Sequence, residues 1–448
     1  MMNISVIGSG YVGLVSGVCL AEKGHKVTCV DVDREKVNKI NQGITPIYER
    51  GLSELLRRNL HGTFFASCDL QEAVMQSQLS LIAVGTPYIG EEIDLTSIKQ
   101  VARDIGHALR GKDDFHAVVI KSTVVPGTTN DVVLPILEET SGKKAGVDFG
   151  VGMNPEFLRE GAAISDFMGP DRIVLGATDN KTLHVMEEVY RVFDNVDVVK
   201  TNTKTAEMIK YTANSLLATL ISFSNEIGNL CSRLGDIDVV DVMSGVHKDK
   251  RFSPLLADGE RVTPGFVSYL AAGCGFGGSC FPKDVKALIA HGKKAGNSMA
   301  LLDSVIHINE KQPREIITLL EKNFNGMKGV RVAILGMAFK PETDDMRESP
   351  AIPIIRHLLT EGAEIQAYDP VAEVEAEKLF GNHQIHYYQD VSQAISGVDA
   401  VVLLTSWEEF AQVPGMMKAT NPQPLFIDGR RMLTKTSFTR YEGIGLSI

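Results

Sequence analysis

The chain has 448 residues, which at about 100–200 residues per domain predicts two to four domains. Hydrophobic residues make up 44% and charged residues 23%, a composition that excludes a wholly disordered chain. The 45 basic and 56 acidic side chains leave a net charge of −11, which argues against a general nucleic-acid binder or a membrane-surface protein. A local basic pocket for an acidic ligand is compatible with this charge.

No segment approaches the roughly 18 apolar residues of a membrane span, and the first residues lack the pattern of a signal peptide. The six cysteines form no CxxC pair, and the histidines show no metal-ligand spacing. We therefore expect a cytoplasmic protein with reduced thiols, no metal site and no membrane partner.

The N-terminal segment is typical of a dinucleotide-binding unit. An apolar strand, Asn3–Ile7, runs into the glycine loop Gly8–Gly13, and the helix that follows ends at Gly24. A second strand, Lys26–Val30, ends in Asp31, close to the spacing of about 20 residues after the loop in the dinucleotide fingerprint.

Further buried strands continue the alternation with helices. Three of them end in polar clusters, at Gly85-Thr86-Pro87, Lys121-Ser122-Thr123 and Asn154-Pro155-Glu156. The predicted strands are residues 79–84, 117–120, 149–153, 173–175 and 196–199. This alternation predicts a largely parallel, doubly wound sheet that binds ligands at the carboxyl ends of its strands.

The pattern changes at Thr203, where one long helix extends to about Leu234. Its length and apolar residues predict that it bridges two domains and packs against a partner subunit, so we expect at least a homodimer. A second α/β block begins at Val330, with strands 330–335, 363–368, 400–404 and 426–427 and a helix at 352–361. Its first turn lacks GxGxxG, so it need not bind a dinucleotide. The predicted fold is α/β, with two Rossmann-like doubly wound domains joined by a long central helix.

The first loop brings backbone N–H groups and a helix N-terminus to a pyrophosphate. Gly8 and Gly10 allow the tight turn and close phosphate approach, and Gly13 lets the helix pack on the strand. Asp31 would bind the ribose hydroxyls and repel a 2′-phosphate, which favours NAD over NADP, although Lys36 nearby weakens that preference. A mononucleotide or flavin site is the alternative.

The segment Gly275–Asp284 surrounds Cys280 with glycines and places Lys283 and Asp284 after it. Glycine-rich backbone offers N–H donors to a thiolate or an oxyanion, and a nearby cation lowers the pKa of a thiol. The alternative is a glycine turn around a buried cysteine. That alternative fits the remaining thiols, which we expect to be inert packing groups: Cys19, Cys29, Cys68, Cys231 and Cys274.

Lys210 and Asn214 lie four residues apart on one face of the long helix. A lysine there is either a functional acid, base or oxyanion partner with a lowered pKa, or an exposed surface residue. Glu156 and Glu160 could hold a water or a sugar hydroxyl, or could be a helix-start pair.

Four basic residues lie in turns of the C-terminal block, and together they could form a basic pocket for a diphosphate. Each alone is equally compatible with a surface charge. They are Lys340, Arg347, Arg430 and Arg431.

A series of motifs follows in order along the chain: Gly8–Leu14, Val30–Asp33, Pro46–Glu49, Val84–Pro87, Lys121–Val124, Asn154–Gly161, the Cys280 loop, Ala338–Pro341 with Asp345–Ser349, and Asp428–Arg431. In these motifs the chain resembles the UDP-glucose/GDP-mannose dehydrogenase family over nearly its whole length. A two-electron hydroxy-acid dehydrogenase of related fold and a non-catalytic NAD-binding regulator are the other hypotheses.

The resemblance implies an oxidoreductase that converts the CH2OH group of a nucleotide sugar to a carboxylate, reducing two NAD per turnover. A thiohemiacetal and then a thioester would form on Cys280, and water would release the product. UDP-glucose is the expected substrate and UDP-glucuronate the expected product. The same chemistry on GDP-mannose or a UDP-N-acetylhexosamine is the alternative.

The resemblance also implies residue roles. Cys280 would be the nucleophile and Lys210 would stabilise the oxyanion. Asp284, with Asn214 and Thr123, would position and deprotonate water. The general base is one or more of Glu156, Asp284 and Lys210. The implied cofactor-binding residues are Gly8, Gly10, Tyr11, Val12, Gly13, Asp31, Lys36, Thr86, Pro87, Thr123, Glu160, Lys283 and Arg347. The implied substrate-binding residues are Glu156, Phe157, Leu158, Arg159, Glu160, Lys210, Asn214, Arg251, Tyr269, Leu270, Gly277, Lys340 and Arg430.

The implied domains are an NAD-binding Rossmann domain at 1–200, a central helical dimerisation domain with the cysteine loop at 201–300, and a UDP-sugar-binding domain at 301–448. Arg251 would act from the neighbouring subunit. The chain departs from the family's pattern in the long stretch Phe252–Ser268, where Arg261 could replace Arg251. Pro264-Gly265-Phe266 is similar to the GDP-mannose enzymes, whereas Pro46–Glu49 and Phe281 favour UDP-glucose.

Overall fold

The computed structural model describes residues 1–381, 384–418, 420 and 422–447. The chain forms two compact units, Met1–Ala213 and Asn214–Ile448. Each unit contains one large sheet and its own buried hydrophobic clusters. None of the described helices is long and apolar enough to cross a membrane.

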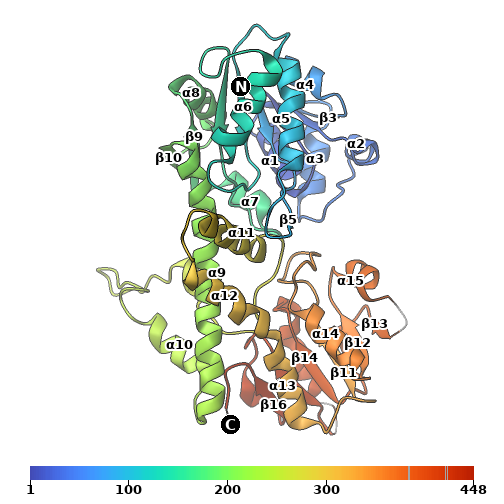
Figure 1. The fold of residues 1–448 in the computed structure, drawn as a ribbon. Helices are drawn as coiled ribbons and strands as arrows, with labels where there is room; N and C mark the ends of the chain where they lie inside the picture. The colour runs from blue at the N-terminus through green and yellow to red at the C-terminus, as the bar shows by residue number, and fades with distance from the viewer. Residues whose placement is uncertain (382–383, 419, 421, 448) are drawn as a thin grey trace. The chain divides into compact units, whose positions relative to one another are not determined.

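The first unit is built on an eight-stranded sheet (Figure 1) in the order β10-β9-β8-β7-β4-β1-β2-β3. Neighbouring strands are parallel except β8 and β9, so the predicted largely parallel sheet is confirmed. The strand bounds are β1 Asn3–Ile7, β2 Lys26–Val30, β3 Phe64–Ser67, β4 Leu79–Ile82, β7 His116–Ile120, β8 Phe149–Met153, β9 Arg172–Ala177 and β10 Asp197–Thr201.

Alternate residues of the central strands enter two clusters because successive side chains point to opposite faces. Val6 and Val119 join the cluster that contains α1, whereas Ile7 and Ile120 join the cluster that contains α5. Burial on both faces explains why these strands read as continuous apolar runs. The helices are α1 Tyr11–Glu22, α2 Arg34–Asn41, α3 Leu52–Asn59, α4 Leu70–Gln76, α5 Thr96–Leu109, α6 Leu134–Ser141, α7 Ala163–Met168 and α8 Asn180–Tyr190, with a small hairpin of β5 Tyr88–Ile89 and β6 Glu92–Ile93.

Helix α9, Thr203–Leu234, has the bounds that its apolar pattern predicts, and the boundary between the two units falls inside it. Pro313 occupies the first turn of α13. A proline fits there because its missing N–H has no partner within the helix. The helices that follow α9 are α10 Val239–His247, α11 Phe281–Lys294, α12 Ala300–Lys311 and α13 Pro313–Asn323.

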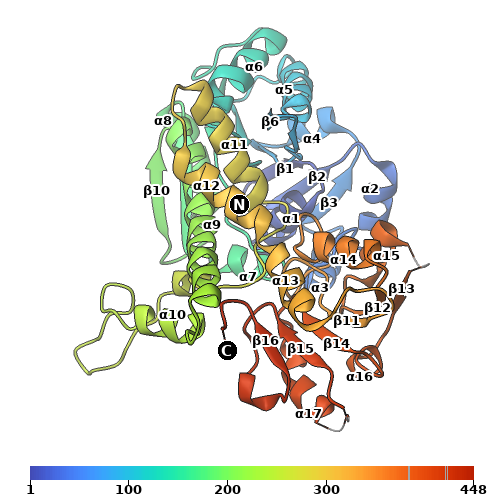
Figure 2. The same cartoon turned by 60° about the horizontal axis from the view of Figure 1, so that its bottom comes forward.

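The second unit contains a six-stranded, all-parallel sheet in the order β13-β12-β11-β14-β15-β16 (Figure 2). Both large sheets therefore share the doubly wound order of a Rossmann fold, as predicted. The bounds are β11 Arg331–Leu335, β12 Glu364–Tyr368, β13 Ile385–Tyr387, β14 Ala400–Leu403, β15 Leu425–Asp428 and β16 Tyr441–Gly443, with helices α14 Ala351–Thr360, α15 Glu373–Phe380, α16 Val391–Ala394 and α17 Val413–Met417.

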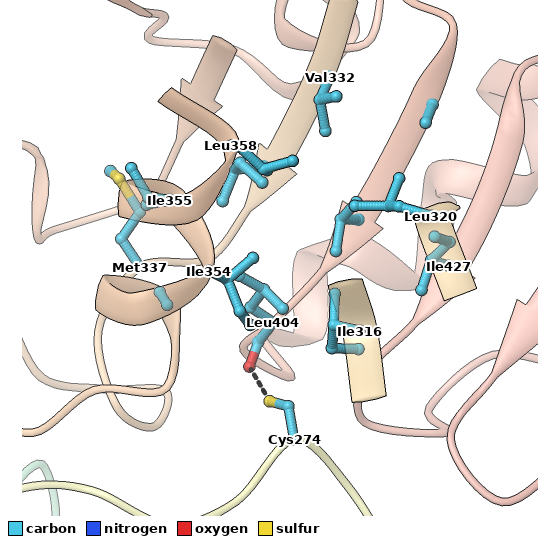
Figure 3. Close-up of a cluster of buried hydrophobic side chains, with 14 of the residues drawn as sticks. Cys274, Ile316, Leu320, Val332, Met337, Ile354, Ile355, Leu358, Leu404 and Ile427 are labelled. Carbon is cyan, nitrogen blue, oxygen red and sulfur yellow. Dashed lines mark hydrogen bonds between the residues drawn. The ribbon is translucent and has the colours of Figure 1, made fainter. Parts of the chain in front are cut away.

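Cysteine burial agrees with the expectation of inert packing for all but one of the five thiols. Cys274 is fully buried beside α13 and α14, and its Sγ lies 3.6 Å from the Leu404 carbonyl oxygen (Figure 3). Burial raises the pKa of Cys19 and of Cys29 to about 12. Cys68 is exposed, so its predicted burial is wrong. Cys68 directly follows Ser67, the last residue of β3, so it lies outside the buried strand.

Candidate active site

The glycine loop after β1 has the geometry that a bound pyrophosphate requires. Gly8 has a φ of +106°, and a Cβ there would lie 2.7 Å from the Ala83 carbonyl oxygen. A Cβ on Gly13 would lie 1.9 Å from the Gly8 oxygen, whereas a Cβ on Gly10 meets nothing within 4 Å. Gly10 is the N-cap of α1 and no side chain caps that helix. Open space at an uncapped helix N-terminus fits the phosphates of NAD.

Asp31 is held in place at the end of β2. Its carboxylate accepts hydrogen bonds from the Ser9 N–H at 2.8 Å, the Ser9 hydroxyl at 2.6 Å and the Asp33 N–H at 3.0 Å. Burial alone would raise the pKa of Asp31, but these hydrogen bonds and the charge of Lys36 hold it below its usual value. Asp31 therefore stays ionised, as an acceptor for ribose hydroxyls must be.

The turns after β4 and β7 are joined by side-chain hydrogen bonds. The Thr86 hydroxyl donates to the Thr123 carbonyl at 2.8 Å, and the Ser122 hydroxyl donates to the Val84 carbonyl at 2.7 Å. Thr86, Pro87 and Thr123 consequently lie together at the carboxyl edge of the sheet. This is the edge at which open α/β sheets bind ligands.

A buried cluster of charges lies at the carboxyl end of β8. Lys210 Nζ lies 3.0 Å from Glu156 Oε1, with side-chain exposures of 4% and 6%. The other Glu156 oxygen accepts from the Leu158 N–H at 2.6 Å. The Phe157 ring lies 5.5 Å from Lys210 Nζ and 3.9 Å from the Arg172 guanidinium carbon. Lys210 is therefore a buried, paired lysine and not the exposed one that its local pattern also allowed.

A second lysine, Lys121, lies beside this pair. Its Nζ donates to Asn154 Oδ1 at 2.8 Å, and the Tyr190 hydroxyl donates to the same oxygen. Burial, with the charge of Lys210, lowers the pKa of Lys121 to about 8 despite the opposing effect of Glu156. Sequence reasoning assigned no role to Lys121, because its burial depends on β7, β8 and α8 meeting.

The second unit holds Cys280 as the N-cap of the 14-residue helix α11, and its side chain is partly exposed. Gly275 and Gly278 have φ values of +106° and +82°, and a Cβ on Gly277 would lie 2.2 Å from the Glu348 oxygen. The Ser279 hydroxyl lies 3.5 Å from the thiol sulfur. A partly exposed thiol at a helix N-terminus has the setting of a reactive cysteine.

Asp284, one turn after Cys280, is fully buried. Asn214 Nδ2 donates to one of its oxygens at 2.7 Å, and Lys283 Nζ donates to the other at 2.5 Å. Lys283 is thus paired with Asp284. Lys210, which pairs with Glu156, and Asn214, which binds Asp284, are one turn apart in α9.

The four predicted basic residues of the C-terminal block have different contact partners. Arg430 donates to the carbonyls of Leu404 at 2.6 Å, Gly275 at 2.9 Å and Phe339 at 3.3 Å, and Lys340 Nζ lies 5.9 Å from the Phe339 ring centre. Arg347 pairs with Asp345 at 2.8 Å. Arg431 instead forms a buried ion pair with Asp238, with both Nη2–carboxylate distances at 2.8 Å.

The first turn of the second sheet, after β11, is held by contacts with residues of the same unit. The buried Asp369, after β12, accepts from the Met337 and Ala338 N–H groups at 2.6 and 3.0 Å. A Cβ on Gly336 would lie 2.4 Å from Thr405 Cβ. These contacts fix the backbone of this turn against the residues that follow β12 and β14.

The segment from Arg251 to Leu270 contains three of the predicted substrate-binding residues, Arg251, Tyr269 and Leu270. Arg251 is 84% exposed and bonds to Asp249 in its own turn. Arg261 donates to the Lys248 and Ser253 carbonyls, both at 2.7 Å. The Tyr269 ring centre lies 6.2 Å from that of Phe281, the residue after Cys280, and the two ring planes are tilted by 44°. Leu270 is buried, and its carbonyl contacts His247 at 3.0 Å.

Two further residues of the first unit were missed by sequence reasoning. Glu49 binds the start of α1 and the turn after Glu160. Glu207, in α9, accepts from the Gly127 and Thr129 N–H groups at the start of the short helical segment Thr128–Val133. Glu49 lies in the Pro46–Glu49 motif, but its partners lie far from it in the chain.

Arg159, a predicted substrate-binding residue, is exposed and forms an ion pair with the nearby Asp166.

Three family models match successive parts of the chain. They are the NAD binding domain of the UDP-glucose/GDP-mannose dehydrogenase family at residues 2–194, its central domain at 204–311 and its UDP binding domain at 333–435. Together they span most of the chain.

Known proteins are similar over nearly the full length. UDP-glucose 6-dehydrogenase of Haloferax volcanii is 40% identical over 99% of this chain and 100% of its own, and GDP-mannose 6-dehydrogenase of Pseudomonas aeruginosa is 38% identical over 95% and 93%. The structure of a UDP-glucose dehydrogenase from Pyrobaculum islandicum, 38% identical, covers 100% of this chain and 98% of its own with a TM-score of 0.89. The chain therefore belongs to the UDP-glucose/GDP-mannose dehydrogenase family and is an NAD-dependent oxidoreductase of nucleotide sugars.

Proposed function

We propose that the protein oxidises UDP-glucose to UDP-glucuronate in two NAD-dependent steps through covalent intermediates on Cys280. The observation that carries the proposal is a partly exposed Cys280 at the start of α11, followed one turn later by the buried Asp284 with its partners Asn214 and Lys283. NAD supplies the hydride acceptor in both steps. The remaining chemistry belongs to side chains of this chain.

Cys280 is the proposed nucleophile. The first oxidation turns the C6 alcohol into an aldehyde, and the thiolate adds to it as a thiohemiacetal. Loss of a second hydride leaves a thioester, and water then releases the carboxylate and the thiol. A covalent bond retains the aldehyde between the two oxidations. The amide groups of the surrounding glycine turn are suited to stabilising the negative charge that develops on oxygen.

Asp284 and Glu156 are the proposed acid–base residues. Asp284 would accept a proton from water positioned with Asn214 and Thr123, and Lys210 would stabilise the oxyanion. Lys210 is suited to this because it is buried and already paired with a carboxylate, so it keeps an ammonium in a site of low polarity. We propose that Glu156 and Asp284 carry the base duty, whereas the ammonium of Lys210 serves the oxyanion.

Cofactor and nucleotide contacts follow the family motifs. The residues that we propose to contact NAD are the glycine loop, Tyr11, Val12, Asp31, Lys36, Thr86, Pro87, Glu160, Lys283 and Arg347. Lys340, Arg430, Arg251, Tyr269, Leu270 and Gly277 are proposed for the nucleotide sugar, together with residues 156–160, Lys210 and Asn214. We also propose that the chain divides into three domains, with boundaries near residues 200 and 300.

The sugar is tested with a panel of purified substrates. UDP-glucose should give two NADH per UDP-glucuronate, and GDP-mannose or a UDP-N-acetylhexosamine should react much more slowly. A faster reaction with GDP-mannose would move the assignment to that substrate, for which a relative of similar identity is known.

The covalent step is tested by Cys280→Ser. Because an alcohol is a far weaker nucleophile than a thiolate, turnover to the carboxylate should fall by roughly a thousandfold or more. Cys68→Ser, which changes an exposed thiol, is the matched control and should keep the activity. Formation of two NADH per product at the original rate in Cys280→Ser would exclude the covalent mechanism.

A homodimer or larger homo-oligomer is proposed from the exposed apolar residues of α9. Leu216, Phe223 and Leu230 are spaced by seven residues and are 58%, 48% and 51% exposed. Such a stripe is typical of a face that packs against another helix. Phe223→Asp should shift the mass measured by light scattering toward the monomer, whereas Lys204→Asp on the same helix should not. An unchanged mass in Phe223→Asp would assign the contact elsewhere.

The proposed location is the cytoplasm. The six cysteines are free, which agrees with a reducing compartment.

A further inference from the structure

The buried carboxylate of Glu49 joins three parts of the first unit that are distant in sequence. Glu49 is 7% exposed and precedes α3. Tyr11 is the first residue of α1 and directly follows Gly10 of the glycine loop. Gly161 follows Glu160 in the turn that leads into α7, and Ala163 is the first residue of that helix.

Three hydrogen bonds from the other two parts converge on the Glu49 carboxylate. One carboxylate oxygen accepts from the Tyr11 hydroxyl and from the Gly161 N–H at 2.7 Å. The other accepts from the Ala163 N–H at 2.9 Å. The Gly161 N–H also lies 3.2 Å from the Tyr11 hydroxyl oxygen. Both carboxylate oxygens thus have donors, as a buried charge requires.

The tyrosine is a firm donor in this arrangement. Burial, then the hydrogen bond and charge of Glu49, raise the pKa of Tyr11 far above its usual value. Its hydroxyl therefore keeps its proton. Gly161, with a φ of +80°, has a backbone conformation that favours glycine, so the turn that presents its N–H to Glu49 is sharply defined.

We propose that Glu49 is a positioning residue that links the phosphate-binding end of α1 to the segment Glu156–Gly161. Its carboxylate holds Tyr11 and the Gly161–Ala163 turn in one arrangement. NAD seated at the start of α1 then favours the same arrangement of Glu156 and Glu160 that the sugar requires. The role of these two glutamates toward the sugar rests on the proposed function, whereas the link to the cofactor side does not.

A link of this kind is reciprocal. If binding at α1 orders the segment, an ordered segment raises the affinity for the cofactor by the same factor. Loss of the link should therefore weaken NADH binding even without sugar. Glu49→Gln should break it, because the amide keeps one acceptor oxygen but turns an NH2 group toward a backbone N–H that needs an acceptor.

The experiment uses the full chain with Tyr11→Phe, Glu49→Gln and the double variant. The dissociation constant of NADH is measured by its fluorescence, and amide exchange of residues 161–163 is measured without cofactor. Tyr441→Phe is the matched control, because it also removes a tyrosine hydroxyl next to a buried carboxylate, that of Asp428 at 3.2 Å in the second unit. KM values for NAD and sugar nucleotide are then compared with kcat.

Both single variants should raise the dissociation constant of NADH by about tenfold, since each removes a hydrogen bond to a charged group. Amide exchange at 161–163 should become faster in both, and the double variant should be less than additive. KM should rise for both substrates with a smaller change in kcat, while Tyr441→Phe leaves NADH affinity unchanged.

Weaker NADH binding in Tyr11→Phe alone would assign Tyr11 a direct cofactor contact and overturn the link through Glu49. Unchanged NADH affinity and exchange in both variants would overturn it as well. Neither measurement requires turnover, so failure of the Cys280 mechanism leaves this result interpretable.

Discussion

At the level of single residues, the Lys210–Glu156 pair combines a cost in stability with a proposed part in the chemistry. Taking an ammonium and a carboxylate out of water is costly, and their attraction repays this only while both partners are present. The distance of 3.0 Å and the near-complete burial place the pair in this category. Removal of one partner leaves the other charge buried and uncompensated.

Lys210→Met should therefore lower the free energy of unfolding by about 3 kcal/mol as well as the activity. The double variant Lys210→Met/Glu156→Gln should regain part of this stability but none of the activity. Denaturant unfolding measures the first and NADH formation the second. Lys204→Met, in the same helix, breaks an exposed pair with Asp131 and should cost less than about 1 kcal/mol. Equal losses in Lys204→Met and Lys210→Met would contradict this account.

At the level of elements, a buried polar network ties β1, β4 and β7 together. His116 Nε2 lies 2.8 Å from the Ser80 hydroxyl, which lies 2.7 Å from the Ser5 hydroxyl. Burial, with the charge of Lys112, lowers the pKa of His116 to about 3. The folded protein thus holds this imidazole neutral at pH values where the unfolded chain protonates it.

The network predicts a loss of stability in mild acid. Between the unfolded pKa of about 6.5 and the folded value of about 3, the unfolded chain binds the extra proton. The free energy of unfolding should thus fall by up to roughly 1.4 kcal/mol per pH unit below about pH 6.5. His25, whose pKa burial also lowers, acts in the same direction.

Denaturant unfolding between about pH 5 and 7, a window chosen because ordinary carboxylates titrate lower, measures this slope. His116→Gln should flatten it, although it lowers stability at pH 7. His184→Gln, whose parent side chain is 70% exposed, should leave it unchanged. The same slope in His116→Gln as in the parent would rule out this origin.

At the level of the whole molecule, two separate sets of hydrophobic clusters imply two melting units. One contains the sheet with the NAD binding domain match, and the other contains the sheet with the UDP binding domain match. A ligand stabilises the unit that binds it, by about 2.7 kcal/mol at a hundred times its dissociation constant.

Scanning calorimetry should accordingly show that NADH raises one unfolding transition and UDP the other. Asp31→Ala should abolish the shift caused by NADH and leave the shift caused by UDP. A single transition that both ligands raise equally would show that the units unfold together.

Much of the fold could be predicted because its signals are local. The glycine loop, Asp31 and the buried strands are each recognisable within a few residues, since turn geometry and burial on both faces constrain nearby positions. The bounds of α9 followed from its own apolar pattern for the same reason. The exposure of Cys68 was not predictable in this way, because the end of a strand is poorly defined by hydrophobicity alone.

The sequence by itself determined the motif set, the NAD-binding loop and the candidate nucleophile. Only the tertiary structure decided that Lys210 is buried against Glu156, that Asp284 binds Asn214, that Arg431 turns to Asp238 and that Glu49 joins α1 to Gly161. Each of these four depends on which distant partner a charge meets as it leaves water. Local sequence does not specify that partner, because the energy of a buried charge is set by the packed surroundings and not by its neighbours in the chain.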